Sequence, residues 1–326
     1  MTRILLTHPV PVRPNYFPPT SVEALAALGE LMTNESDAEW TAEELIEHAR
    51  DCDIVVNYRE TPAGGAIFDA LPVLRAWVRV AVDIRNIDLA AASRNGVLVT
   101  NASGVFVSSV AEWTLAAMID VGRRFSDAIA AYHAGRVPAP VMGPELKGAT
   151  LGLVGYGRIG RYLVDLALAF GMRVLVSDPY CRVDRTDVRQ VGMDELLAEA
   201  DHVVCLAVAN AETENLIDAG VFRRMKRSAF FINPSRGNLV DEVALLDALD
   251  RGLIAGCALD VGRAEDQMPT LAIARHPRTI ATPHLGGLTP SLYQQSVEAV
   301  AQVADIVAGR MPGNALNAEH ARRLRS

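Results

Sequence analysis

The chain has 326 residues and a mass of 35.1 kDa, about twice the length that one hydrophobic core usually serves, which predicts two domains. Half of the residues are apolar and 21% are charged, which excludes a mainly disordered chain. The formal net charge is −8 and no long run of Lys or Arg occurs. We therefore expect no nucleic-acid and no membrane partner, and instead small molecules or other copies of the chain.

Four cysteines are scattered without a C-x-x-C pair or a nearby set of histidines, so we expect no metal site and reduced core thiols: Cys52, Cys181, Cys205 and Cys257. The N-terminus has only a three-residue apolar run, which is too short for a signal peptide. No segment approaches the roughly 18 uncharged apolar residues that cross a bilayer. The sequence predicts a soluble, cytoplasmic protein.

Short β-like runs alternate with helical patterns along the first hundred residues. The predicted elements are a strand at 3–7, a helix at 21–31, a strand at 53–56, a helix at 66–71 and a strand at 77–82. Such alternation is typical of a parallel sheet with helices on its faces. Residues 107–125 follow as a helix that is apolar around most of its circumference, so we expect it to be buried between domains or against a partner subunit.

A second α/β series follows a connection. Residues 125–147 contain three prolines and are predicted to cross a surface without regular structure. Strands are then predicted at 149–155, 172–177, 202–206, 229–232, 255–259 and 279–281, with helices at 158–170, 193–200 and 243–251. This series predicts a doubly wound parallel sheet. A long helix at 290–309 and a basic tail at 321–326, expected to be solvated, complete the chain.

The sharpest local signal is a glycine pattern between a predicted strand and a predicted helix. Gly155, Gly157 and Gly160 match G-x-G-x-x-G, and Arg158 and Ile159 complete the turn. The first glycine allows a tight turn, the second lets backbone approach a pyrophosphate, and the third lets the helix pack close to the strand. The N-terminus of the helix then offers N–H groups and a partial positive charge to phosphates. The pattern predicts a dinucleotide site.

Asp178 ends the next predicted strand, 18 residues after Gly160, where a carboxylate can bind the two ribose hydroxyls. The same carboxylate would repel the 2′-phosphate of NADP by roughly 4 kcal/mol at about 4 Å and an effective dielectric constant of about 20. We therefore expect NAD as the cofactor rather than NADP. Arg182 is close enough in sequence to offset part of this repulsion.

Three downstream segments at 231–242, 258–261 and 282–287, with 87–89, 96–99 and 110–112 upstream, extend the motif pattern over nearly the whole chain. Together they resemble the D-isomer specific 2-hydroxyacid dehydrogenases, a family that includes D-3-phosphoglycerate dehydrogenase and glyoxylate/hydroxypyruvate reductases. The resemblance implies an NAD-dependent dehydrogenase, a 2-hydroxy or 2-keto acid substrate and a homodimer.

The fold implied is α/β in two domains, a Rossmann doubly wound sheet and a smaller flavodoxin-like α/β domain for the substrate. Residues 1–100 are expected to form the first part of the substrate-binding domain, and residues 101–286 the NAD-binding domain. Residues 287–326 would return to the substrate-binding domain as a C-terminal helix.

The resemblance also implies roles for four side chains. His284 matches the acid/base histidine, and an imidazole pKa near 6.5 suits proton exchange near neutral pH. Glu265 matches a glutamate that holds this histidine and raises its pKa. Arg236 matches the planar, two-pronged donor to the substrate carboxylate, and Asp260 matches a contact of the nicotinamide carboxamide or its ribose.

Each of these residues alone also has an ordinary interpretation: a loop histidine, a solvated glutamate, a salt-bridged arginine and a capping aspartate. Their common position at or just beyond the carboxyl ends of predicted strands favours the catalytic interpretation. One departure from the family pattern affects Glu265, because Asp266 follows it where the family usually has proline. A second affects residues 206–213, which retain only the final Glu-Thr of a cofactor-contacting motif.

The largest departure lies at residues 79–88, where bulkier residues replace the glycine-rich loop that binds the substrate carboxylate in the family. Arg59, Arg79 and Arg85 are candidate cations there, and Arg59 and Arg85 are the predicted substrate contacts. Our hypothesis is that at least one of the three binds a second anionic or strongly polar group on the substrate. The alternative is that they form surface or interdomain salt bridges.

Two other functions fit the same motifs. Some relatives with this fold serve as corepressors, so a nicotinamide-sensing binding protein without turnover is one alternative. An enzyme of the formate dehydrogenase type is the other.

Overall fold

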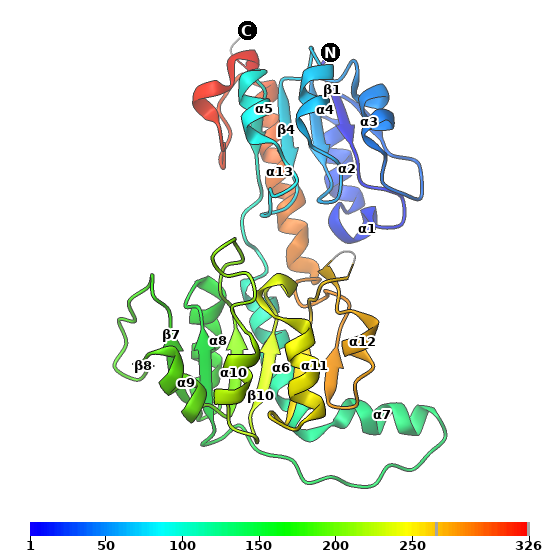
Figure 1. Cartoon of the computed structure of the whole chain (residues 1–326). Coiled ribbons are helices and arrows are strands. Elements are labelled where there is room, and N and C mark those ends of the chain that lie inside the picture. Colours follow the sequence, from blue (N-terminus) through cyan, green and yellow to red (C-terminus); the bar gives the residue numbers. More distant parts are fainter. Residues whose placement is uncertain (265–266, 325–326) are drawn as a thin grey trace. The chain divides into compact units, whose positions relative to one another are not determined.

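Two parallel sheets organise the chain in a computed structural model, which describes residues 1–264 and 267–324 (Figure 1). The chain divides into two compact units. Unit 1 comprises residues 1–105 and 290–326, and unit 2 comprises residues 106–289. The expected α/β fold is confirmed, whereas the roles predicted for the domains stay predictions.

The sheet of unit 1 has the order β2-β1-β3-β4-β5, and every pair of neighbours is parallel. This is the 2-1-3-4-5 order of flavodoxin-like sheets. Its strands are β1 (Arg3–Leu6), β2 (Glu30–Thr33), β3 (Ile54–Asn57), β4 (Ala76–Arg79) and β5 (Leu98–Thr100). The inner strands β3 and β4 are buried along their whole length because helices cover both faces of the sheet.

Those helices form two layers. One core includes α3, α4 and α5 around Phe68 and Trp77, and the other includes α2 and α13 around Phe17 and Leu25. The helices of unit 1 are α1 (Arg13–Tyr16), α2 (Pro19–Ala26), α3 (Ala42–Ala49), α4 (Gly65–Ala70), α5 (Leu89–Arg94) and α13 (Tyr293–Val307). Short 3₁₀ turns lie at η3 (Pro290–Leu292), η4 (Ala318–His320) and η5 (Arg322–Leu324).

The sheet of unit 2 has the order β12-β11-β10-β9-β6-β7-β8, again with parallel pairs throughout. With its first strand counted as one, the order is 7-6-5-4-1-2-3, which is the Rossmann order with a seventh strand added. The strands are β6 (Thr150–Val154), β7 (Arg173–Ser177), β8 (Arg189–Gln190), β9 (His202–Cys205), β10 (Phe230–Asn233), β11 (Gly256–Leu259) and β12 (Thr279–Ala281). The predicted doubly wound sheet is confirmed.

Helices cover both faces of this sheet as well. The helices of unit 2 are α6 (Val107–Arg123), α7 (Phe125–His133), α8 (Arg158–Ala169), α9 (Met193–Glu199), α10 (Ala219–Arg224), α11 (Glu242–Asp250) and α12 (Leu271–Ala274), with the 3₁₀ turn η1 (Gly237–Leu239). The apolar helix predicted at 107–125 is α6, and it packs against α8, β10 and β11 within unit 2. Its apolar surface is therefore explained largely by the core of its own unit.

Two predicted segments differ from the structure. The helix expected at 21–31 ends at Ala26, and Glu30 begins β2. Gly29 explains the change, because a Cβ there would lie 2.3 Å from the backbone oxygen of Thr2 beside β1. The connection expected at 125–147 begins with α7, since its prolines lie beyond this helix. Arg124, with φ of 55°, separates α6 from α7.

The tail expected to be solvated is solvated only in part, because Arg322 is the one exposed residue of its described part. Ala321 and Leu324 are buried in unit 1. Arg323 donates to the backbone oxygens of Leu71 and Leu74, at 2.8 and 2.9 Å. The basic side chains thus satisfy carbonyl groups while their apolar neighbours join the core.

The four cysteines are free, as expected. Cys52, Cys205 and Cys257 are buried, and burial raises the pKa of the Cys52 thiol to about 11. Cys181 differs from the expectation of core thiols because it is only half-buried. Its sulfur lies 3.0 Å from Nη2 of Arg161.

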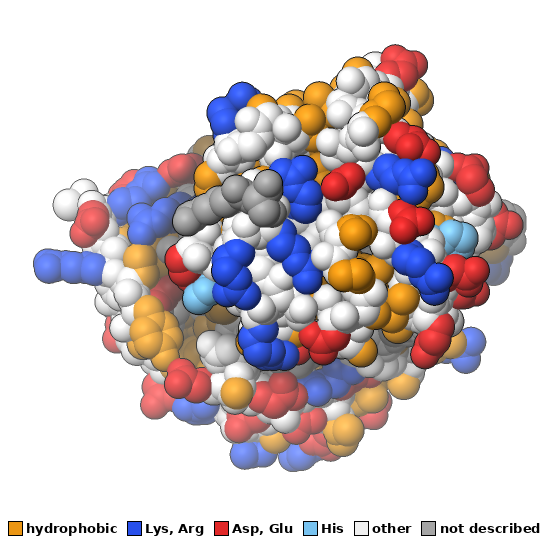
Figure 2. Space-filling model, turned by 90° about the horizontal axis from the view of Figure 1, so that it is seen from above, with side chains coloured by type: hydrophobic (Ala, Val, Ile, Leu, Met, Phe, Trp, Pro, Cys, Tyr) orange, Lys and Arg blue, Asp and Glu red, His pale blue; other side chains and the backbone are white. Residues whose placement is uncertain are grey.

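Basic and acidic side chains are interspersed on the face drawn in Figure 2. Unit 2 has exposed ion pairs, such as Arg189 with Glu195 and Arg251 with Asp247. Among the described residues, no helix is long and apolar enough to span a membrane.

Candidate active site

The glycine turn between β6 and α8 shows why two of its glycines are required by the fold itself. Gly155 has φ of +96°, and a Cβ there would lie 2.7 Å from the backbone carbonyl of Leu206. A Cβ on Gly160 would lie 2.9 Å from the backbone oxygen of Gly155 and 3.1 Å from Leu153. The first glycine therefore makes the turn, and the last lets α8 approach β6.

Gly157 is different, because no heavy atom lies within 4 Å of the position that a Cβ would take. Its φ of −78° and ψ of −162° are also open to other residues. The packing of the chain thus gives no reason for glycine here, whereas a pyrophosphate lying against this backbone does. The N-terminus of α8 has no side-chain cap and no acidic residue in its first turn, so it suits an anion.

The other predicted cofactor residues surround this turn. Arg158 is exposed at the first position of α8, and Ile159 is half-buried against the core of unit 2. Asp178 follows β7, and its Oδ2 accepts the backbone N–H of Tyr156 at 2.7 Å. This hydrogen bond holds the carboxylate beside the glycine turn, where the ribose of a bound dinucleotide would lie. The residues present fit an NAD molecule.

Arg236 follows β10 in a short, braced loop. The side chain of Asn233 donates to the backbone oxygen of Arg236 at 2.9 Å and accepts the N–H of Ser235 at 3.0 Å. The backbone of Gly237 lies so close to Gly262 that a Cβ would come within 1.9 Å of the Gly262 oxygen. Only glycine at 237 allows this approach between the loops that follow β10 and β11.

His284 follows β12 and has φ of 54°, an uncommon conformation for a residue with a side chain. Its backbone N–H donates to the backbone oxygens of Asp260, at 2.9 Å, and Thr282, at 3.0 Å. Backbone outliers of this kind concentrate at functional sites. The imidazole is half-buried.

Asp260, which is 2% exposed, fixes the loop that carries His284. Its Oδ1 accepts the hydroxyl of Thr282 at 2.6 Å and the N–H of Leu285 at 2.8 Å, and its Oδ2 accepts the N–H of Gly286 at 2.8 Å. Its own backbone N–H donates to Asn233 at 3.2 Å. A single residue after β11 therefore joins the end of β10 to the segment that follows β12.

These contacts bring two of the predicted catalytic residues to one edge of one sheet. Because β10, β11 and β12 are adjacent and parallel, Arg236, Asp260 and His284 all follow carboxyl ends at the same edge. Open α/β sheets bind ligands at this edge. The predicted partner Glu265 and its neighbour Asp266 lie outside the described residues.

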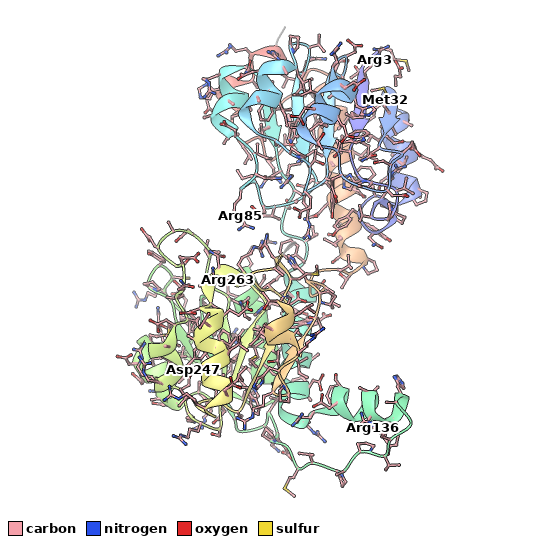
Figure 3. All side chains as sticks on the ribbon, turned by 45° about the vertical axis from the view of Figure 1, so that its right-hand side comes forward. Arg3, Met32, Arg85, Arg136, Asp247 and Arg263 are labelled. Carbon is pink, nitrogen blue, oxygen red and sulfur yellow. The ribbon has the colours of Figure 1, made fainter. Side chains whose placement is uncertain are left out.

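Sequence reasoning missed the positioning role of Asp260 and also missed Arg263. Arg263 donates to the backbone oxygens of Asn238 and Val240, each at 3.0 Å, and lies 2.9 Å from Glu214 (Figure 3). It thereby anchors the segment after β11 to the segment after β10. The sequence carries no local signal for these contacts, because they join residues distant along the chain.

Among the candidate cations of unit 1, Arg79 belongs to the scaffold. It is 2% exposed, and its guanidinium donates to the backbone oxygens of Asp83, at 2.9 Å, and Tyr58, at 3.2 Å. It also donates to Oδ1 of Asn86 at 2.6 Å. Burial lowers the pKa of Arg79 to about 10.

Arg59 and Arg85 are more accessible, and each pairs with an acidic neighbour. Nε of Arg59 lies 3.0 Å from Glu60, and Nη2 of Arg85 lies 2.6 Å from Asp83. Arg85 is labelled in Figure 3. The side chain of Arg85 is 54% exposed. Both cations thus already have partial charge compensation.

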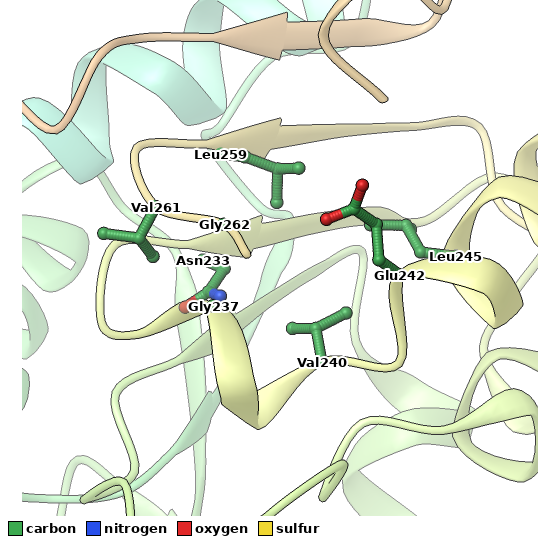
Figure 4. Close-up of a pocket in the computed structure, with 8 residues that line it drawn as sticks. All are labelled: Asn233, Gly237, Val240, Glu242, Leu245, Leu259, Val261 and Gly262. Atoms are coloured by element: carbon green, nitrogen blue, oxygen red, sulfur yellow. The ribbon is translucent and has the colours of Figure 1, made fainter. Parts of the chain in front are cut away.

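A small pocket of about 10 Å³ lies beneath the Arg236 loop and is lined by Gly237, Val240, Glu242 and Gly262, among others (Figure 4). This volume suits about one water molecule. It is too small for an organic acid, so this pocket is a gap beside the close contact between Gly237 and Gly262.

Comparison with known proteins identifies the class. Residues 115–286 match the family model described as D-isomer specific 2-hydroxyacid dehydrogenase, NAD binding domain. A glyoxylate reductase of Korarchaeum cryptofilum is 34% identical over 286 residues, which cover 84% of this chain and 86% of that protein. A D-3-phosphoglycerate dehydrogenase of Methanocaldococcus jannaschii is 31% identical over 325 residues, which cover 97% of this chain but 60% of that longer protein.

Among solved structures, the TT0316 protein of Thermus thermophilus has a TM-score of 0.88 and 30% identity, covering 97% of this chain and 100% of that chain. The chain therefore belongs to the D-isomer specific 2-hydroxyacid dehydrogenase family. It is an NAD-dependent oxidoreductase, and the residues that match the NAD binding domain model lie in unit 2. The predicted family, fold class and cofactor are confirmed.

Proposed function

We propose that the enzyme interconverts a D-2-hydroxy acid and the matching 2-keto acid, with His284 as the acid/base group and Arg236 as the ligand of the substrate carboxylate. Bound NAD(H) supplies or accepts the hydride. The observation that carries the proposal is a series of contacts at one edge of the nucleotide-binding sheet. Asp260 holds the loop of His284 and bonds to Asn233, whose side chain holds the backbone of Arg236. That edge is also where the glycine turn lies.

His284 is proposed to exchange a proton with the substrate oxygen at C2. Its backbone is held by Asp260 and Thr282, so the imidazole projects from a fixed point. Glu265 is proposed to hold the imidazole and to favour its protonated form, as the resemblance to the family implies. A protonated His284 would donate its proton in keto acid reduction, and a neutral one would accept it in the reverse reaction.

Arg236 is proposed to bind the substrate carboxylate, because a planar guanidinium can donate two parallel hydrogen bonds. Asn233 and Gly237 hold the backbone on either side of this residue. We expect Arg236→Lys to keep the positive charge but to raise KM and lower kcat/KM at least tenfold for carboxylate substrates, about 1.4 kcal/mol of lost transition-state binding. Steady-state kinetics check this expectation, and unchanged kcat/KM would contradict it.

For the cofactor, we propose contacts from the glycine turn at Gly155, Gly157, Arg158, Ile159 and Gly160 and from two further positions. Asp178 would bind the adenosine ribose and disfavour NADP. Asp260 is proposed to lie beside the nicotinamide end, in addition to the hydrogen bonds that it accepts from its own loop. The main support for this proposal is Gly157, because no heavy atom of the chain lies within 4 Å of the position that its Cβ would take.

Arg59 and Arg85 are proposed as further contacts of the substrate. A second anionic group on the substrate would compete with Glu60 and Asp83 for these cations. The proposal predicts that kcat/KM differs between 2-keto acids with and without a second anionic group. Equal values for the two kinds of substrate would remove it.

The test of the reaction is a panel of 2-keto acids with NADH or NADPH, followed by absorbance at 340 nm, together with formate as an electron donor for NAD⁺. We expect reduction of at least one keto acid with NADH and no oxidation of formate. Tight NADH binding without turnover of any keto acid would favour a binding protein. Oxidation of formate would instead favour an enzyme of the formate dehydrogenase type.

We also propose that the enzyme is a homodimer and that α7 with residues 134–147 takes part in the interface. This segment extends from unit 2 (Figure 1) and exposes large apolar side chains, among them Tyr132 at 62%, Val137 at 85% and Met142 at 99%. Patches of this kind mark interaction sites. A monomer mass that does not change with concentration would contradict the dimer.

The cytoplasm is the proposed compartment, which the four free cysteines support.

A further inference from the structure

A hydrogen bond between two exposed side chains bridges the flanks of the glycine turn. In the sheet, β6 lies between β7 and β9, so the turn after β6 lies between the segments that follow those two strands. Tyr180 belongs to the segment after β7, and Glu212 belongs to the segment after β9. The Tyr180 hydroxyl donates to Oε2 of Glu212 at 3.2 Å. This bridge joins the two sides of the site where the dinucleotide lies.

The Tyr180 side of the bridge is anchored to the glycine turn. Oδ1 of Asp178 accepts the N–H groups of Tyr180, at 2.8 Å, and Cys181, at 3.0 Å, and its Oδ2 accepts that of Tyr156. The residue that carries the bridging hydroxyl is thus fixed to the proposed ligand of the adenosine ribose. The bridge therefore lies near the adenosine half of the cofactor.

The Glu212 side is anchored by a compact turn. Oδ1 of Asn210 accepts the N–H groups of Glu212, at 2.8 Å, and Thr213, at 3.1 Å. The Thr213 hydroxyl donates to the backbone oxygen of Val208 at 2.7 Å. These contacts hold the backbone on both sides of the glycine turn, whereas Tyr180 itself is 85% exposed. An exposed hydrogen bond adds little to the stability of the fold, so stability alone does not explain the bridge.

We propose that the Tyr180–Glu212 bridge closes over the adenosine half of NAD and that Glu212, held there, acts with Asp178 to exclude a 2′-phosphate. The bridge must open for the cofactor to enter or leave, so it slows cofactor release. Glu212 adds a second negative charge on the side of the site opposite Asp178. A negative charge near the 2′-phosphate of NADP weakens the binding of that dianionic group by repulsion, even without direct contact.

Tyr180→Phe tests the closure, because it removes the bridging hydroxyl and keeps both carboxylates. The rate of NADH release is measured by stopped-flow fluorescence after mixing with excess NAD⁺, without any keto acid. We expect the release rate to rise roughly two- to tenfold, the range that corresponds to one lost hydrogen bond. A release rate equal to that of the unsubstituted enzyme would overturn the closure.

Glu212→Gln tests the charge, because the amide oxygen of glutamine still accepts the Tyr180 hydroxyl. Fluorescence titrations give the Kd values of NADH and NADPH. We expect the ratio of the NADPH Kd to the NADH Kd to fall about two- to fivefold, as for loss of one exposed charge. If NADPH binds the unsubstituted enzyme too weakly for its Kd to be measured, the effect of Glu212→Gln on the ratio of the two Kd values is measured in an Asp178→Ser background. An unchanged ratio in both backgrounds would overturn the role of Glu212.

Asp247→Asn is the matched control, since it also removes one exposed carboxylate from unit 2. Asp247 lies on α11 and pairs with Arg251 (Figure 3). We expect this variant to change neither the release rate nor the Kd ratio, and equal effects in the control would overturn both parts of the proposal. Because only cofactor binding is measured, the outcome is independent of the roles proposed for His284 and Arg236.

Discussion

Individual glycines in this enzyme have separate physical reasons. Gly237 is required by the fold, because any side chain would overlap Gly262. Gly157 meets no part of the chain, and its backbone is in a commonly allowed conformation. Packing therefore requires glycine at 237, whereas we propose that ligand binding requires it at 157.

This difference predicts opposite results for two matched substitutions. Gly157→Ala should leave the melting temperature within about 2 °C, since an open surface position costs at most about 0.5 kcal/mol. It should nevertheless weaken NADH binding at least tenfold, because the methyl group would occupy space at the pyrophosphate. Calorimetry and NADH fluorescence titration measure the two effects.

Gly237→Ala should lower the free energy of unfolding by about 1–3 kcal/mol or more, because the added methyl group overpacks the loop. Urea denaturation measures this loss. The account of these glycines is contradicted if Gly157→Ala destabilises the fold as much as Gly237→Ala does, or if Gly157→Ala binds NADH normally.

At the scale of elements, Asp260, which follows β11, connects the end of β10 to the segment that follows β12. Asp260→Asn would place amide hydrogens against at least one of the N–H or O–H donors that the carboxylate now accepts. We expect a loss of about 1–3 kcal/mol in the free energy of unfolding and a fall in kcat, because the loop that carries His284 would lose its anchor. Urea denaturation and steady-state kinetics check this expectation. Unchanged stability and kcat would contradict the anchoring role.

The elements that the sequence predicted best are those with a strong local pattern. The strand, glycine turn and helix at 149–170 combine an apolar run, a turn and an amphipathic pattern, and the structure contains β6 and α8 there. Strand β2 was missed because it has only four residues and none of them is fully buried. So short a segment shows no alternation of apolar and polar residues that would distinguish a strand from the end of a helix. The prediction of a solvated basic tail failed in part, because the contacts that hold the tail are with residues far along the chain.

The candidate site was predictable only in part for the same reason. The positions of Arg236 and His284 after strands are local features, and the order of motifs identified them. Their joining through Asp260 depends on the order of strands in the sheet, which short-range patterns do not determine. Arg263 was missed because the contacts described above join it to residues far from it in sequence.

At the scale of the whole molecule, each unit contains a buried histidine that is neutral when folded. His8, in unit 1, is 0% exposed, and His202, in unit 2, is 1% exposed. Burial, with a smaller contribution from Arg13 and Arg79, lowers the pKa of His8 to about 3. Burial lowers the pKa of His202 to about 4.

These shifts predict that the enzyme loses stability in mild acid. Both imidazoles titrate near pH 6.5 in the unfolded chain, so below that pH the unfolded state binds more protons than the folded state. The stability is present in full above about pH 6.5 and falls as the pH drops toward 4, by about 1.4 kcal/mol per pH unit for each imidazole. Urea denaturation at pH 7 and pH 5 measures the fall.

His8→Phe should reduce this fall by the share of one imidazole, because phenylalanine fills the aromatic surroundings of Tyr16, Phe17 and Tyr58 without titrating. A dependence on pH that is the same in both proteins would contradict the assignment to His8.

The central claim is that His284 transfers the proton while the rest of the nucleotide-binding sheet holds the cofactor. The most direct measurement compares kcat and the Kd of NADH for His284→Ala, using the keto acid that the unsubstituted enzyme reduces best. We predict a fall in kcat of about 10²- to 10⁴-fold with the Kd of NADH changed less than about threefold. Turnover at the unsubstituted rate, or a parallel loss of NADH binding, would contradict the account.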